Sequence, residues 1–118
     1  MNFSVDPQGK IVVVSTHVEK LDASNAPELK SHFLQLNKIG SNFILLDLSK
    51  TKYCDSSGLS AILVGNRVSK NSDGTFVVSG IKDMVEKLIQ ISQLDSILNI
   101  TPTISEARDL IFMDEVQR

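Results

Sequence analysis

The residues of this chain that could do chemistry are concentrated in one short segment, 55–58, which reads DSSG. Leu59, Ile62 and Leu63 follow at helical spacing, and small hydroxyl or carboxylate residues ahead of such a pattern are typical of a helix N-terminus. Backbone N–H groups and the positive end of the helix dipole point outward there, so a phosphate is well tolerated. A serine at this place predicts either a helix cap or a modification site, and the segment alone favours the cap.

Other chemistry has little support in the sequence. The two histidines, His17 and His32, lie far apart without an acidic or cysteine cluster, and there is no phosphate-cradling glycine loop and no GxSxG elbow. The single cysteine, Cys54, excludes an internal disulfide and a multi-cysteine metal site, and we expect a small buried thiol at a strand end. We therefore expect no autonomous enzyme, no cofactor and no metal.

Length and composition predict a single domain, residues 1–118, of a size that buries roughly two-thirds of its unfolded surface. The net charge is −2 with acids and bases interspersed, so no basic face indicates nucleic acid. No segment approaches the ~20 apolar residues of a membrane span, and the N-terminus has no apolar core of signal-peptide length. We expect a cytoplasmic protein.

The segment 55–58 is positioned by a strand before it and a helix after it. Residues 43–48 are apolar at both parities, which predicts a strand buried on both faces. The helix is expected from Ser57 to about Lys70, with Ser57 as its cap. It has two apolar stripes, of which one can cover a sheet. The other is covered either by neighbouring helices or by a partner, and it consists of Ala61, Val64, Gly65 and Val68.

The remaining elements alternate between strand and helix. A hairpin with its turn at residues 7–9 opens the chain, and residues 16–20 are compatible with a continuation of its second strand. A first helix follows, with Asn25 as its N-cap and Gly40 at its end. Later elements are a strand at 75–79, a helix from 82–83, a strand at 97–100 and a helix from 102–103. The order ββαβαβαβα predicts an α/β domain with a mixed, mostly parallel sheet.

Over almost its whole length the chain resembles the STAS domain family, whose members include anti-sigma factor antagonists. The resemblance rests on Leu21-Asp22, on residues 46–49 and, most specifically, on residues 55–59 (DSSGL), which resemble the family's phosphorylation motif; residues 85–88 and 93–95 also match. It implies that Ser56 is phosphorylated by an ATP-binding anti-sigma factor, a serine kinase, and that a serine phosphatase reverses the mark. The chain departs from the family pattern at two positions: Glu19 stands where the family often has glycine, and Asn25 stands where it favours threonine. Both lie near the region expected to face the partner, so they bear on the identity of the partner.

The resemblance also implies a switch, in which the unphosphorylated form binds the anti-sigma factor and frees the sigma factor. Phosphate adds about −1.5 to −2 charges beside Asp55. A partner groove shaped for a neutral hydroxyl would then meet extra bulk and an unpaired charge, which is costly to bury. The partner-binding residues that the resemblance implies are Asp22, Asn25, Asp55, Ser56, Ser57, Gly58 and Leu59.

Three other functions fit the sequence less well. A response-regulator receiver needs an acidic pair after its first strand, and none follows residues 11–14. A serine hydrolase using Ser56 has no histidine nearby in the sequence. The main alternative is a non-switching STAS module, a scaffold in a stress-signalling or lipid-transport assembly, in which Ser56 only caps the helix.

Overall fold

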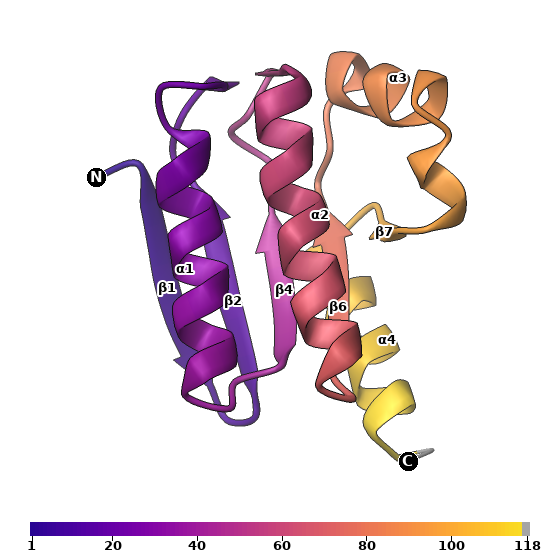
Figure 1. Cartoon of the computed structure of the whole chain (residues 1–118). Coiled ribbons are helices and arrows are strands. Elements are labelled where there is room, and N and C mark those ends of the chain that lie inside the picture. Colours follow the sequence, from indigo (N-terminus) through magenta and orange to yellow (C-terminus); the bar gives the residue numbers. More distant parts are fainter. Residues whose placement is uncertain (117–118) are drawn as a thin grey trace.

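The computed structural model describes residues 1–116 and shows a five-stranded sheet with helices on both faces (Figure 1). The strands lie in the order β1-β2-β4-β6-β7, and only β1 runs antiparallel to its neighbour. Their bounds are β1 Phe3–Gln8, β2 Ile11–Thr16, β4 Phe43–Asp47, β6 Thr75–Ser79 and β7 Asn99–Thr101. This single α/β domain with a mixed, mostly parallel sheet confirms the predicted fold class.

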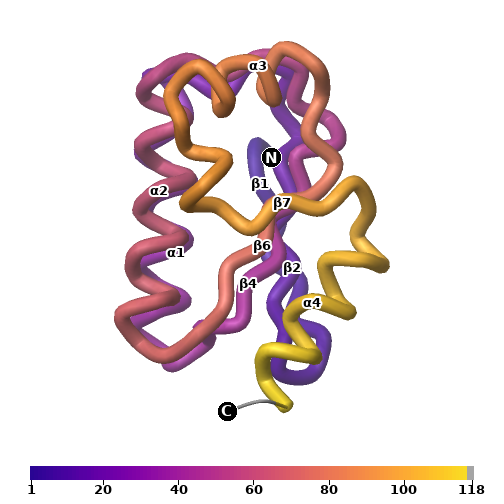
Figure 2. The backbone as a smooth tube through the Cα atoms, turned by 90° about the vertical axis from the view of Figure 1, so that its right-hand side faces the viewer, coloured from indigo at the N-terminus to yellow at the C-terminus, as the bar shows by residue number. Residues whose placement is uncertain are grey.

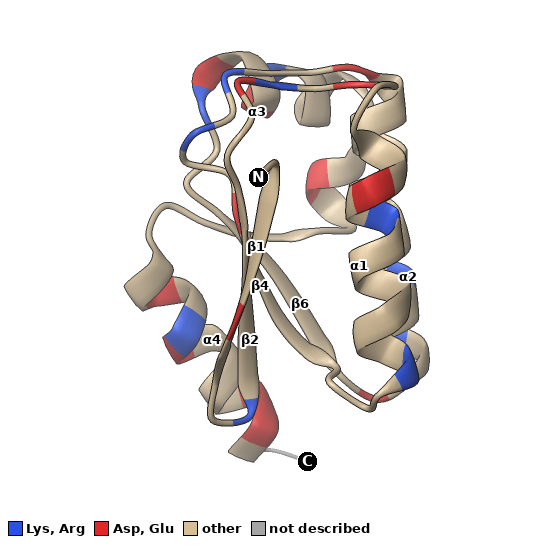
Figure 3. Ribbon diagram, turned by 90° about the vertical axis from the view of Figure 1, so that its left-hand side faces the viewer, with Lys and Arg blue, Asp and Glu red and all other residues tan. Residues whose placement is uncertain are grey.

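The helices form a layer on each face of the sheet and a cover over one end. Helices α1 (Ala26–Lys38) and α2 (Ser56–Asn71) lie side by side on one face, and α4 (Ile104–Val116) lies on the other (Figure 3). Helix α3 (Asp83–Ile91) crosses the end of the sheet at which α2 begins, and the 3₁₀ turn η1 (Leu94–Ser96) connects it to β7 (Figure 2). The start of α2 therefore lies between α1 and α3.

The central strand β4 has buried side chains on both faces, as predicted. Ile44 and Leu46 belong to the larger apolar cluster under α1 and α2, and Leu45 belongs to the smaller cluster under α4. All three are fully buried. Alternate residues of one strand thus hold both helix layers, because successive strand side chains point to opposite faces.

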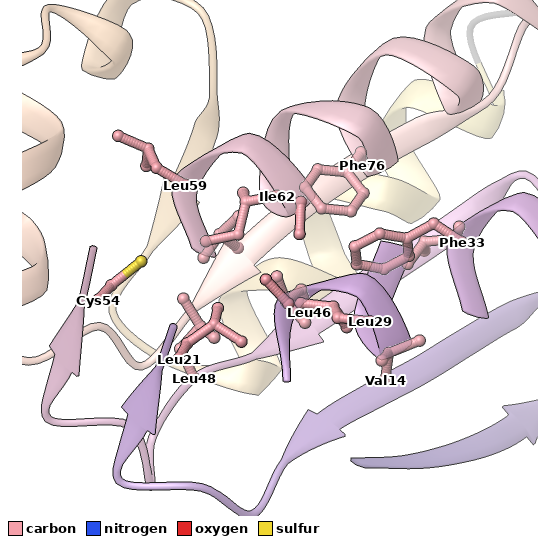
Figure 4. Close-up of a cluster of buried hydrophobic side chains, with 14 of the residues drawn as sticks. Val14, Leu21, Leu29, Phe33, Leu46, Leu48, Cys54, Leu59, Ile62 and Phe76 are labelled. Carbon is pink, nitrogen blue, oxygen red and sulfur yellow. The ribbon is translucent and has the colours of Figure 1, made fainter. Parts of the chain in front are cut away.

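Three of the four residues of the second apolar stripe of α2 lie against neighbouring elements of the chain, which favours the first of the two alternatives left open by the sequence. Ala61, Val64 and Gly65 are buried within the chain. A Cβ at Gly65 would lie 2.6 Å from a ring carbon of Phe76 and 2.8 Å from one of Phe33. These two rings meet edge to face, with centroids 5.4 Å apart (Figure 4). These three residues are therefore part of the core, whereas Val68, the fourth residue of the stripe, is partly exposed.

Two predicted boundaries are wrong for local reasons. Pro7 and Gln8 belong to β1, and the hairpin turns at Gly9-Lys10, where Gly9 has a φ of 68°. The last strand begins at Asn99 rather than Ile97. The N–H groups of residues 97 and 98 both donate to the carbonyl of Leu94, at 3.0 and 2.9 Å, so the turn η1 uses donors that a longer strand would need.

A second, two-stranded sheet was not predicted. Strands β3 (Lys20–Leu21) and β5 (Tyr53–Cys54) pair in parallel outside the main sheet. Strand β2 ends at Thr16, so the continuation of this strand through residues 16–20, with which the sequence was compatible, does not occur. The Thr51 hydroxyl donates to the carbonyl of Val18 at 2.7 Å and is buried, which fastens the connection before β5 to the connection before β3.

Candidate functional site

The pairing of β3 with β5 brings two acidic residues to one place. Leu21 lies opposite Cys54 in the register, and the N–H of Asp55 donates to the carbonyl of Leu21 at 3.2 Å. Asp22 and Asp55 therefore each follow the end of one of two neighbouring strands. This short sheet places the two residues at the same edge.

The start of α2 is fixed by Asp55 and not by Ser57, so the predicted cap was wrong. Asp55 has an extended backbone and its Oδ1 accepts a hydrogen bond from the N–H of Gly58 at 3.0 Å. The helix thus begins at Ser56, one residue earlier than predicted, and Ser57 already lies inside its first turn. A carboxylate three residues before an unpaired helix N–H satisfies that donor, which leaves no capping role for either serine.

Ser56 is an exposed residue in the first turn of α2. Within residues 1–116 its hydroxyl makes no hydrogen bond, whereas the cap is already supplied by Asp55. The Ser56 hydroxyl thus contributes no hydrogen bond to the fold of the described residues. The positive end of the helix dipole lies beside it, where added negative charge is stabilised by typically 0.3–1 kcal/mol.

Gly58 and Leu59 support this helix start from beneath. Both are buried, and a Cβ at Gly58 would lie 2.5 Å from the carbonyl oxygen of Leu21 and 2.7 Å from the Cys54 sulfur. Only a residue without a side chain lets α2 approach the small sheet this closely. Burial, with a smaller contribution from the negative charge of Asp55, raises the pKa of the Cys54 thiol to about 12. Cys54 is therefore the buried thiol at a strand end that the sequence predicted.

The loop before α1 is held by polar contacts of Asp22 and Asn25. Hydrogen bonds from the hydroxyl and the N–H of Ser24, at 2.6 and 3.0 Å, hold the pKa of Asp22 below its ordinary value. Asn25 is buried; it accepts from the N–H of Asp22 at 3.0 Å and donates to the carbonyl of Lys20 at 2.9 Å. Asn25 thus precedes α1 as predicted, but its side chain fastens the loop instead of capping the helix.

Ser56 lies between two surface depressions that the sequence did not reveal. One, of about 390 Å³, separates the starts of α1 and α2 and is lined by Ala23, Ala26, Pro27, Lys30, Ser56, Ser57 and Ser60. The other, of about 320 Å³, separates the start of α2 from α3 and is lined by Tyr53, Cys54, Asp55, Ser56, Met84, Lys87, Leu88 and Ile91. The sequence contained one sign of the second depression, because Met84, Leu88 and Ile91 recur at helical spacing in addition to the core residues of α3.

Two kinds of site are absent from the part of the chain that the structure describes. Residues 1–116 contain no group of three His, Cys, Asp or Glu side chains placed to hold a metal ion. They also contain no helix of the length and hydropathy that a membrane crossing requires.

Comparisons with known proteins agree on one family. The family model described as "STAS domain" matches residues 2–107. The chain is 34% identical over 109 residues to a protein of Thermotoga maritima named "Putative anti-sigma factor antagonist", covering 91% of each. The crystal structure of an anti-sigma factor antagonist, also described as putative, from that organism superposes with a TM-score of 0.84 at 29% identity, over 92% of this chain and 93% of the other.

A more distant structure shares the fold. The phosphorylated form of the Bacillus cell fate determinant SpoIIAA superposes with a TM-score of 0.72 at 20% identity, over 92% of this chain and 98% of the other.

Proposed function

Because this chain belongs to the STAS domain family of anti-sigma factor antagonists, we propose that it is an antagonist controlled by phosphorylation of Ser56. In the unphosphorylated form it binds an anti-sigma factor, a serine kinase of the ATP-binding type, and thereby frees the sigma factor. The kinase phosphorylates Ser56 and ends the complex, and a serine phosphatase restores the binding form. The chain acts by binding, in a bacterial cytoplasm, and not as an enzyme.

The observation that supports this proposal best is the free hydroxyl of Ser56. Asp55 caps α2 through the N–H of Gly58, so the fold does not need the Ser56 side chain. The non-switching alternative assigned that residue a capping role, and the hydrogen bonds give the role to Asp55. An exposed serine without a structural partner is accessible to a kinase and can be modified without unfolding the helix.

Phosphorylation would block the partner by local charge and bulk. The added group carries about −1.5 to −2 charges. It would join Asp55 and Asp22, and the lowered pKa keeps Asp22 ionised at neutral pH. A partner that covers this edge must then desolvate the phosphate next to two carboxylates, which costs several kcal/mol unless cations of the partner compensate it.

The proposed partner-binding residues divide into two groups by burial. Asp22, Asp55, Ser56 and Ser57 are at least partly exposed and would contact the anti-sigma factor directly. Asn25, Gly58 and Leu59 are buried, so they would act by holding the loop before α1 and the start of α2 in place.

The experiment combines phosphosite mapping with binding measurements. Affinity capture from the native cell with wild type and Ser56→Asp as baits identifies the kinase. Incubation with this kinase and ATP should place one phosphate on Ser56 and not on Ser57, as read from fragment mass spectra. Binding should fall at least tenfold on phosphorylation and in Ser56→Asp, whereas Ser56→Ala should still bind. Melting temperatures should stay within a few degrees, since surface changes usually cost under ~0.5 kcal/mol.

Ser105→Asp is the matched control. Ser105 is also an exposed serine in the first turn of a helix, but α4 lies on the opposite face of the sheet. This variant should bind as wild type does. Equal binding of phosphorylated and unmodified protein would refute the switch and favour a scaffold; loss of binding through unfolding would refute the mechanism while leaving the site intact.

A further inference from the structure

Helix α3 presents an apolar strip that the core does not use. Val85 and Ile89 are its buried residues and pack into the larger core cluster. Met84 and Ile91 are 60% and 71% exposed, and Leu88 between them is half-buried. Residues spaced by four and then three positions share one side of a helix. Met84, Leu88 and Ile91, here called the α3 strip, therefore form a continuous apolar side.

The α3 strip belongs to the same depression as the modification site. Together with Tyr53, which is 44% exposed, it lines the 320 Å³ depression whose other wall contains Asp55 and Ser56. The depression on the other side of Ser56 has smaller or polar lining residues, among them Ala23, Lys30 and Ser60. The two sides of Ser56 thus differ in chemistry, and the side towards α3 is the apolar one.

Resting on the function proposed above, we propose that the α3 strip with Tyr53 is the apolar docking surface for the anti-sigma factor kinase that modifies Ser56. To transfer a phosphoryl group, the active site of the kinase must enclose the Ser56 hydroxyl. A specific interface covers about 800 Å² on each partner, which corresponds to a disc of about 16 Å radius. The α3 strip and Ser56 line one depression. A disc of this size centred on Ser56 therefore extends over the strip.

The chemistry of the surface defines the complementary part of the kinase. The α3 strip fits large aliphatic or aromatic side chains projecting from a helix or loop beside the nucleotide site of the kinase. Lys87, exposed in the same depression, fits an acidic residue next to them. A few buried anchor residues, among which tyrosine is enriched, supply most of the affinity in protein interfaces, and Tyr53 lies beside the α3 strip. The α3 strip would therefore supply affinity in both phosphorylation states, and Ser56 would supply the difference between them.

The test uses the full chain and, as probe, the purified kinase identified by Ser56 phosphorylation. The double variant Met84→Ser, Ile91→Ser should bind this kinase at least about tenfold more weakly than wild type. In the kinase reaction it should raise KM and leave kcat unchanged, since the lost contact exists in ground state and transition state alike. The matched control is Met113→Ser, Val116→Ser on α4, where the two residues are 54% and 63% exposed. It should bind within twofold of wild type.

The outcomes separate this inference from the proposed function. If the α3 variant binds within twofold of wild type while phosphorylation still weakens wild-type binding, the docking surface is wrong and the switch stands. If phosphorylation does not change wild-type binding, the proposed function fails whatever the α3 variant does. If the α3 variant melts well below wild type, amide NMR shifts of the wild-type chain on adding the kinase decide: changes along residues 84–91 support the surface, and their absence overturns it.

Discussion

Replacement of Asp55 measures how much its carboxylate contributes to the start of α2. In Asp55→Ala the N–H of Gly58, now 3.0 Å from the Asp55 Oδ1, loses its partner within the protein. Removing such a cap costs about 1 kcal/mol, within a range of roughly 0.5–2. Asp55→Asn keeps an oxygen acceptor of nearly equal capping strength and loses only the charge beside the helix dipole, about 0.3–1 kcal/mol. Asp55→Asn should therefore be the more stable variant.

These free energies correspond to measurable shifts in the melting temperature. An unfolding entropy of about 2.1 cal/mol/K per residue gives about 0.25 kcal/mol/K for 118 residues, so a loss of 1 kcal/mol lowers the melting temperature by about 4 °C. Far-UV circular dichroism during heating measures this, and urea unfolding gives the free energy independently. Asp109→Ala is the control, because Asp109 is an exposed helical aspartate away from any helix start. It should not melt below wild type.

Two results would refute the reasoning. If Asp55→Ala melts at the wild-type temperature, the hydrogen bond to Gly58 does not hold the helix start. If Asp55→Asn melts as low as Asp55→Ala, the charge of Asp55 stabilises the protein and the cap does not.

Two further predictions test the packing around the site. Gly65→Ala should lower the free energy of unfolding measured in urea, because overpacking against Phe33 and Phe76 costs about 1–3 kcal/mol and outweighs the ~1 kcal/mol gain in helix propensity; an unchanged or higher value would contradict this. The Cys54 thiol, with a pKa of about 12, should resist alkylation in the folded protein near its ordinary pKa of 9.0 and react once unfolded. The unfolded chain releases this proton at lower pH than the folded one, so stability should fall as pH rises from about 9 towards 12, and Cys54→Ser should lose that slope.

The sequence by itself determined the elements whose signals are local. The apolar run at 43–48 predicted a strand buried on both faces, and the short strand predicted at 75–79 matches β6 (Thr75–Ser79). The DSSG segment predicted a helix N-terminus, because capping depends on residues only three positions apart. The same local motif supported the resemblance to the family that the comparisons then showed.

Only the tertiary structure decided how these elements meet at the site. Strands of two residues, such as β3 and β5, show no periodicity, so their pairing and the shared edge of Asp22 and Asp55 could not be predicted. Whether Asp55 or Ser57 caps α2 depends on the residue at which the chain passes from β5 into the helix. The hydrogen bond that the N–H of Asp55 donates to the carbonyl of Leu21 helps to fix this position. The depressions beside Ser56 are built from α1 and α3, far away in the chain. The physical reason is the same in each case: periodicity and capping act within one turn or strand, whereas these contacts join residues about 30 positions apart.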